Sequence, residues 1–125
     1  REYPVMTSWQ QQVRKDGESG LIYNLWDRPC FVDTSRAYTQ APALIGQSST
    51  TELLLDTWIN MFERDPSSLK HVLFPIHDAI LCEVPIADAR RFSEFVISCA
   101  DQTINGIEIF MEAGKPGRSW SEAMH

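Results

Sequence analysis

The hydrophobic positions of the chain switch between a helical spacing and short apolar or alternating runs. Helical spacing over residues 5–13 predicts a first helix, which Gly17 or Gly20 can end. Aromatic and β-branched residues then predict a β-hairpin or a bent strand pair over 20–33, with Pro29 at an edge or bulge. Residues 34–46 have no dominant period, so we expect a loop that leads into the next helix.

A stronger helical signal begins after Gln47. Ser48, Ser49 or Thr50 is expected to cap the first turn, and Glu52 lies close to the predicted N-terminus. The apolar stripe of this helix consists of Leu54, Trp58, Met61 and Phe62, and Asp65-Pro66 ends it.

Two short apolar runs predict a strand, a tight turn and a second strand over 71–85, with His77 and Asp78 in the turn. Helical spacing returns from Ala87 to Thr103, and a turn at 105–106 leads into an alternating, half-buried strand. The predicted fold class is therefore α+β, a short antiparallel sheet with packed helices.

Composition and charge narrow the function classes. The 125 residues, 43% hydrophobic and 22% charged, describe one ordinary globular domain or part of one. A net charge of −6 argues against a stand-alone nucleic-acid-binding module, but not against carboxylates that hold divalent metal beside a nucleic acid. Neither a membrane span nor a secretory signal is evident. Cys30, Cys82 and Cys99 form no CxxC pair and are predicted to be reduced core residues of a cytoplasmic protein.

The pair His77-Asp78 is the main candidate for chemistry, because an unpaired buried carboxylate costs several kcal/mol. One interpretation is a polar turn between two core strands. A metal-binding phosphohydrolase pair is a poor alternative, because it needs further histidines and only His71 and His125 remain. A third is phosphoryl transfer with carboxylates that bridge two metal ions about 3.5–4 Å apart. Candidates for its second carboxylate are Asp27, Asp33 and Glu83.

The segment PIHDAILCEVP resembles motif C of family A DNA polymerases, the group of bacterial DNA polymerase I and many phage replicases. Four further segments resemble motifs of that family in the same order and at similar spacing: EYPV at the start, GLIYNLWDR, QSSTTELL, and GRSWSEAMH at the end. The resemblance covers residues 1–125 and implies the C-terminal segment of a polymerase palm. Its motif C-like strand–turn–strand lies at 72–85.

By this resemblance, Asp78 would be one of the two catalytic, metal-binding aspartates of the palm. It would hold Mg²⁺, which lowers the pKa of the primer 3′-hydroxyl and neutralises the triphosphate. His77 would lie beside the primer terminus on the minor-groove side of the DNA. Trp120 would pack the tail against the palm, and the carboxylate of His125 would lie close to the active site.

Four other residues would contact DNA by the same resemblance. Gln47 matches the glutamine that contacts the minor-groove edge near the terminal base pair, where the acceptors look alike for all pairs. Arg36 and Gln40 match the Arg and Asn that precede this glutamine, although the interval is longer here. Arg28 would approach the phosphates of a strand.

The chain also departs from the family pattern. Ala79 replaces the glutamate after the aspartate, and Val5-Met6 replaces the Gly-Val of the first motif. No segment resembles the first catalytic aspartate or the fingers helix. The resemblance thus implies primer–template DNA and dNTP as ligands. It also implies a second polypeptide or a missing upstream region that carries the fingers, thumb and first aspartate.

The location implied is the cytoplasm, of the bacterial host if the chain is phage-encoded. Two alternatives stay open at this point. One is a polymerase-derived structural or interaction subunit without catalytic function. The other is an unrelated α+β protein with a coincidental His-Asp turn.

Overall fold

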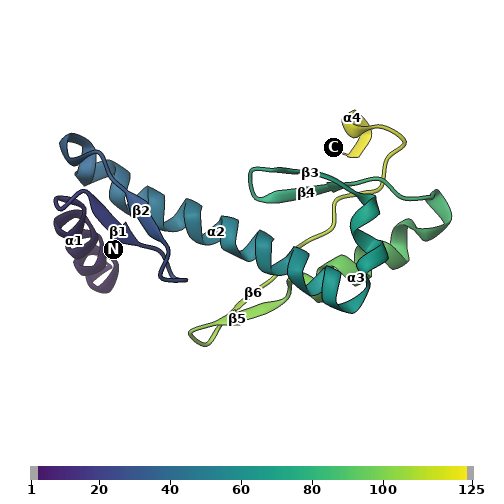
Figure 1. Ribbon diagram of the computed structural model, residues 1–125, viewed down its shortest axis with the longest axis horizontal. Coiled ribbons are helices and arrows are strands. Elements are labelled where there is room, and N and C mark those ends of the chain that lie inside the picture. The colour runs from purple at the N-terminus through teal and green to yellow at the C-terminus, as the bar shows by residue number, and fades with distance from the viewer. Residues whose placement is uncertain (1–2, 124–125) are drawn as a thin grey trace. The chain divides into compact units, whose positions relative to one another are not determined.

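The structure is a computed structural model that describes residues 3–123, and its fold is α+β, as predicted (Figure 1). In place of one short sheet, the strands form three separate antiparallel pairs within these residues: β1–β2, β3–β4 and β5–β6. The chain divides into two compact units, Arg1–Glu52 and Leu53–His125, and each is described by itself.

The helices and strands are α1 (Pro4–Gly17), β1 (Leu21–Tyr23), β2 (Pro29–Phe31), α2 (Ala37–Arg64), β3 (Val72–Ile76), β4 (Ala79–Cys82), α3 (Ala89–Ala100), β5 (Gln102–Ile104), β6 (Ile107–Ile109) and α4 (Trp120–Ala123). Short 3₁₀ helices cover Thr34–Arg36, Pro66–His71 and Ile86–Asp88. Within residues 3–123, no helix has both the length and the apolar character that crossing a membrane requires.

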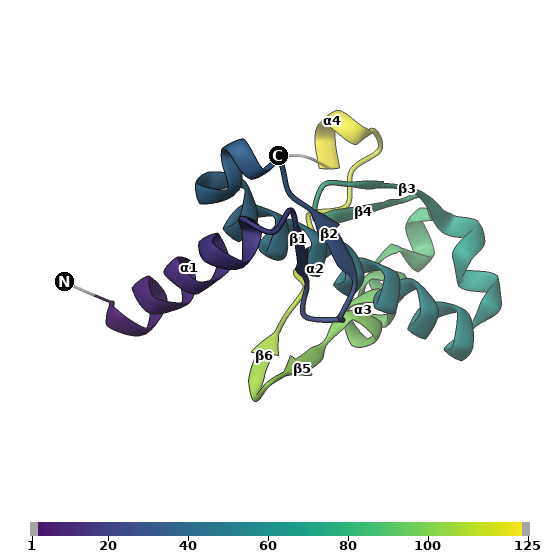
Figure 2. The same cartoon turned by 60° about the vertical axis from the view of Figure 1, so that its left-hand side comes forward.

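In the first unit, α1 and the hairpin β1–β2 pack on the first part of α2 (Figure 2). The predicted helix and hairpin are confirmed, and α1 ends at Gly17. A Cβ atom at Gly17 would lie only 2.7 Å from the Cβ of Ala41, so the absence of a side chain allows the two helices to approach closely. The core of this unit consists of Val13, Ile22, Val32, Ala37 and Ala41, with Cys30, Leu44 and Ile45 packed against it.

The predicted loop over 34–46 is wrong, because α2 begins at Ala37 and runs through Pro42. Proline has no N–H, so the carbonyl of Tyr38 receives no hydrogen bond from residue 42 inside the helix. Arg14 on α1 replaces this bond: its Nε donates to the Tyr38 carbonyl at 2.9 Å. Its guanidinium carbon also lies 3.7 Å from the centre of the Tyr38 ring. A contact from another helix thus lets α2 contain a proline.

The predicted cap at Ser48 to Thr50 is also wrong, because these residues lie inside α2. The hydroxyl of Thr50 donates to the carbonyl of Gly46 at 3.1 Å, and that of Thr51 to the carbonyl of Gln47 at 3.1 Å. Such bonds to the preceding turn satisfy a hydroxyl without ending the helix. Glu52 therefore lies in the middle of a helix and not at its N-terminus.

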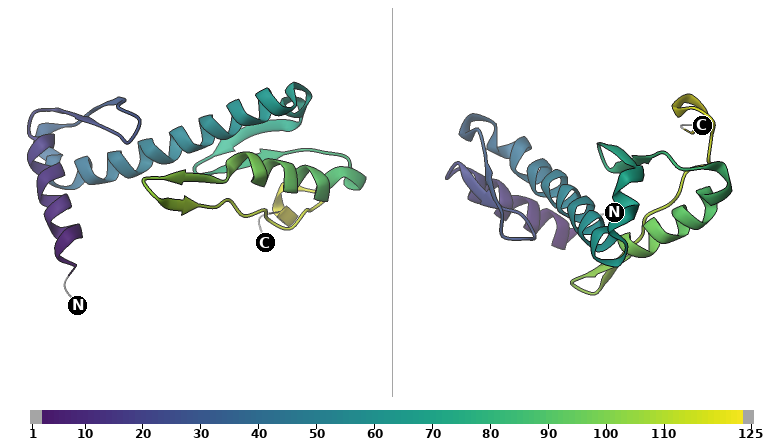
Figure 3. Two further views of the ribbon diagram at one scale, coloured as in Figure 1. Left: turned by 90° about the horizontal axis from the view of Figure 1, so that it is seen from below. Right: turned by 45° about the vertical axis from the view of Figure 1, so that its right-hand side comes forward.

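In the second unit, the last turns of α2 pack against α3 (Figure 3). Asn60 donates to the carbonyl of Cys99 and Arg64 to that of Ser98, both at 2.9 Å, and these bonds satisfy carbonyls at the end of α3. Of the predicted stripe on α2, Phe62 is exposed. The core consists of Met61, Val96 and Cys99, with Trp58, Leu69, Val72, Phe92, Phe95 and Met111 packed against it.

The element boundaries in the second unit agree with the prediction at some positions and differ at others. The end of α2 at Arg64, before Asp65-Pro66, is confirmed. The predicted helix to Thr103 ends at Ala100, because β5 follows at Gln102. The turn at 105–106 is confirmed, with a positive φ at both residues, as type I′ turns require. The expected half-buried face of the following strand is only partly present, because Ile107 is 67% exposed.

Trp120 packs the tail against a strand, as expected, and one of the three cysteines is fully buried. Trp120 on α4 packs edge-to-face on Phe74 of β3, with 5.5 Å between the ring centroids. All three cysteines are free thiols; Cys99 is fully buried, whereas Cys30 and Cys82 are half-buried. Burial raises the pKa of the Cys82 thiol. The predicted position of the His125 carboxylate lies outside the described residues.

We expect Arg14→Met to lower the free energy of unfolding by about 1–2 kcal/mol, because the Tyr38 carbonyl loses its donor. In a Pro42→Ala background the same change should cost less, since an alanine at that position has an N–H that can donate to Tyr38 within the helix. Chemical denaturation of the four proteins in this double-mutant cycle measures the difference. Lys15→Met, at an exposed position on the same helix, is the control. Equal losses in both backgrounds would contradict the role of Arg14.

We expect a loss of stability in acid that depends on Asp33 and Asp65. The hydroxyl and N–H of Ser35 donate to Asp33, and those of Ser67 donate to Asp65. Both pairs of bonds hold the carboxyl pKa below its ordinary value of 3.8. The stabilisation by these two depressed pKa values is fully present above pH 3.8 and is lost as the pH falls through the folded-state values.

The double variant Asp33→Asn/Asp65→Asn should therefore show a flatter dependence of unfolding free energy on pH below 3.8. Denaturant titrations across that pH range measure the slope. The control is Asp88→Asn, since the Asp88 side chain caps no helix. An unchanged slope in the double variant would contradict the assignment.

Candidate functional site

The candidate site is the turn between β3 and β4. His77 and Asp78 are its two loop residues, because Ile76 on β3 pairs with Ala79 on β4 across the turn (Figure 1). Both side chains are exposed. The predicted strand, tight turn and strand are confirmed, and the turn brings the Asp78 carboxylate into water. This position removes the desolvation cost that a carboxylate between two apolar strands would otherwise carry.

The backbone of His77 has an unusual conformation. Its φ of 53° lies in the left-handed region, which few residues other than glycine, asparagine, aspartate and histidine adopt. Such residues are found preferentially at active sites and ligand-binding sites, where the strain fixes a side chain in place. At this turn the left-handed residue is next to the exposed carboxylate of Asp78, and Asp27 and Asn105 in the other two hairpin loops have a positive φ as well.

The structure places the candidate second carboxylates away from Asp78 or in the other unit. Glu83 follows β4 five residues after Asp78, which corresponds to about 16 Å along an extended strand. Asp33 and Asp27 belong to the first unit, and Asp33 accepts hydrogen bonds from Ser35. No group of three or more His, Cys, Asp or Glu side chains within residues 3–123 is arranged to hold a metal ion.

The single carboxylate of Asp78 fits a contribution to a magnesium site. Mg²⁺ prefers oxygen ligands and is usually bound through one or two carboxylates, together with waters and the phosphates of a substrate. Asp78 offers two exposed carboxylate oxygens at the end of a paired hairpin. The remaining ligands of the magnesium ion would have to come from groups outside the β3–β4 hairpin.

The other predicted site residues all lie in the first unit. Gln47 is exposed on α2, and Arg36 is exposed at the end of a 3₁₀ helix. Gln40 has a structural contact, because its Oε1 accepts the N–H of Asp33 at 2.8 Å. Arg28 forms an ion pair that the sequence did not indicate: its Nε lies 2.5 Å from Oε1 of Glu52.

Sequence analysis missed a group of buried polar residues between the β1–β2 loop and α2. The Oδ1 of Asn24 accepts two backbone N–H groups of the loop, at 2.9 and 3.1 Å. Ser49 accepts the N–H of Leu25 at 3.4 Å, and Glu52 pairs with Arg28. The signal that could have found Ser49 and Glu52 is the helical spacing 37, 41, 45, 49, 52, which continues the buried side of α2 with polar residues once the helix is known to start at Ala37.

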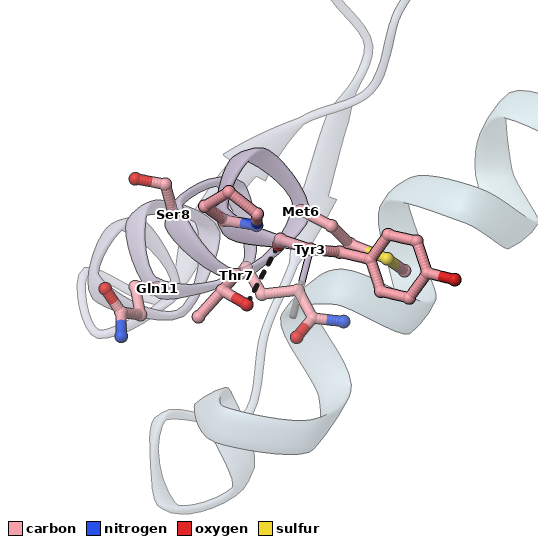
Figure 4. A pocket seen from close by; sticks show the side chains of 7 residues that line it. Tyr3, Met6, Thr7, Ser8 and Gln11 are labelled. Carbon is pink, nitrogen blue, oxygen red and sulfur yellow. Dashed lines mark hydrogen bonds between the residues drawn. The ribbon is translucent and has the colours of Figure 1, made fainter. Parts of the chain in front are cut away.

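A shallow hollow on α1 is a weaker candidate (Figure 4). Tyr3 and Met6 project to one side of the helix, whereas Ser8 and Gln11 point to the other. The hydroxyl of Thr7 donates to the carbonyl of Tyr3 at 3.1 Å, a bond within the helix. Because a single helix lines this hollow, it cannot enclose a small ligand, and it holds no pair of groups suited to acid–base chemistry.

No family model matches the chain, and neither a curated protein nor a solved structure matches it.

We expect His77→Gly to raise the free energy of unfolding by up to about 1 kcal/mol, because glycine adopts the left-handed conformation without strain. His77→Val should lower it, since a β-branched residue is disfavoured there. Thermal or denaturant unfolding measures both. As a matched control, Asn105→Gly in the β5–β6 turn should gain less, because asparagine tolerates a positive φ. Stabilisation by valine would contradict the strain at His77.

Proposed function

We propose that this chain is the C-terminal palm segment of a family A DNA polymerase and contributes one catalytic carboxylate, Asp78, to template-directed nucleotidyl transfer. The observation that carries the proposal is the exposed His77-Asp78 turn at the end of an antiparallel hairpin, within a sequence that resembles motif C. A carboxylate fixed at a hairpin turn suits metal-assisted phosphoryl transfer, because the paired strands limit its movement.

Each candidate residue has a definite task in this proposal. Asp78 holds one side of a magnesium site; Mg²⁺, when bound, supplies charge neutralisation for the triphosphate and activation of the primer 3′-hydroxyl. His77 lies next to it and contacts the primer terminus. Gln47 and Arg28 bind the duplex, through the minor groove and a phosphate respectively. Arg36 and Gln40 are weaker members of the DNA-binding set, since Gln40 is already engaged with Asp33.

The proposal requires further protein that supplies the fingers, thumb and first catalytic aspartate. Two observations support such a partner. The turn between β3 and β4 offers one carboxylate, Asp78, and two-metal transfer needs more than one. On α1, Val5, Met6 and Trp9 are 83%, 56% and 44% exposed, an apolar surface of the kind that another polypeptide covers.

A second candidate is a polymerase-derived subunit with a structural role only. It is favoured by Ala79, which stands where the family has a glutamate, directly after Asp78. In that case the turn would keep its shape without binding metal. The two candidates make opposite predictions for a substitution at Asp78.

We expect Asp78→Asn to reduce primer extension by at least about a thousandfold, because loss of a metal-binding carboxylate removes several kcal/mol of transition-state stabilisation. The assay measures Mg²⁺-dependent extension of a primer–template by the assembly that contains this chain in its native source. Asp101→Asn, which removes an exposed carboxylate of the same unit at the end of α3, is the matched control and should keep full activity.

Unfolding curves of both variants exclude a folding defect as the cause. Extension at the wild-type rate by Asp78→Asn would favour the structural subunit over the catalytic segment. An assembly without any extension activity, although it binds primer–template, would lead to the same conclusion.

A further inference from the structure

The carboxylate of Glu52 has an unusual environment. It lies in the middle of α2, and the residue is only 5% exposed. A buried carboxylate is costly unless a cation or hydrogen-bond donors accompany it. Its partner is Arg28, whose Nε lies 2.5 Å from Glu52 Oε1.

The Arg28 side chain remains accessible to a ligand although it pairs with Glu52. Glu52 contacts the guanidinium of Arg28 at Nε. The Arg28 side chain is 64% exposed. Because a guanidinium is planar and rigid, a contact that fixes the Nε edge also fixes the direction of the terminal N–H groups.

The backbone of Arg28 is held as well. Its N–H donates to Oδ1 of Asn24 at 3.1 Å, and its carbonyl accepts the N–H of Asn24 at 3.0 Å. Ser49 on α2 accepts the N–H of Leu25 in the same loop. The arginine is therefore restrained at both ends before any ligand arrives, which lowers the entropic cost of binding an anion.

We infer that Glu52 is a positioning residue, which holds Arg28 so that its terminal amino groups bind a backbone phosphate of duplex DNA. The inference rests on the proposed function, in which this chain contacts a primer–template. Planar N–H pairs of arginine match phosphate oxygens in geometry as well as in charge. The new element is the task of the buried carboxylate, which does not touch DNA and acts through the arginine.

The removal of the Glu52 charge separates positioning from simple electrostatics. Without a positioning role, Glu52→Gln removes a negative charge near the DNA and should strengthen binding. With that role, the same substitution should weaken binding several-fold, because a neutral amide holds the guanidinium less firmly. The opposite sign of the two effects makes the substitution informative.

The test measures the affinity of the assembly for a short primer–template duplex as a function of salt concentration. Arg28→Gln should weaken binding and reduce the slope of log K against log salt by about 0.9, the value for one lost phosphate contact. Arg28→Lys, which keeps the charge but has no planar fork, should also bind more weakly than wild type. The matched control is Glu18→Gln, an exposed carboxylate of the same unit, which should bind no more weakly than wild type.

A second measurement needs no variant. In the DNA-free protein, the Nε–H signal of Arg28 in a ¹H–¹⁵N spectrum should be resolved and protected from solvent exchange, and duplex DNA should shift it. A signal averaged with those of mobile arginines would overturn the inference even if Glu52→Gln fails to fold.

The outcomes distinguish this inference from the proposed function. If wild type binds the duplex and Glu52→Gln or Arg28→Lys binds equally well or more tightly, the positioning role is overturned and the proposed function stands. If the wild-type assembly binds no duplex, the DNA contact of the proposed function fails, and this inference fails with it.

Discussion

The ion pair between Arg28 and the buried carboxylate of Glu52 joins the β1–β2 loop to the middle of α2 in the first unit. The buried side of α2 begins with small and apolar residues and continues with polar ones, so the middle of the helix cannot be covered by an ordinary apolar surface. The β1–β2 loop covers it instead and supplies the donors that these polar groups need.

The same requirement, that every buried polar group finds a partner, explains the length of α2. Pro42 removes one hydrogen bond from the helix, and Arg14 on α1 restores a donor for the Tyr38 carbonyl. Farther along, threonine hydroxyls bond to the preceding turn and so remain compatible with the helix. The helix continues where its local sequence favours a loop and a cap, because these partners are available in the folded unit.

The His77-Asp78 turn does not depend on contacts between residues far apart in the chain. Its shape depends on two short strands that pair locally, and both of its side chains are exposed. The left-handed backbone at His77 is a conformation that glycine would adopt without strain. The turn presents an exposed carboxylate next to an exposed imidazole.

The features that could be predicted from the sequence are those that depend on residues close together in the chain. The β1–β2 and β3–β4 hairpins, the end of α2 before Pro66 and the position of the His-Asp turn depend on neighbours a few residues apart, so the sequence was sufficient for them. Of the β5–β6 hairpin, only the turn and the second strand were predicted, because helical spacing extended to Thr103. Candidate site residues could be named, but not their contacts: the partner of Arg28 lies 24 positions away at Glu52, and Gln40 proved to be bonded to Asp33.

By itself, the sequence determined the α+β class, the first two hairpins and the His-Asp turn, because strand pairing across a tight turn and helix termination at proline are local events. Only the tertiary structure decided where α2 begins, which of its polar residues are buried, and how Arg28 is oriented. Those features depend on groups far apart in the chain, such as Arg14 and Tyr38, whose interaction exists only once the unit has folded.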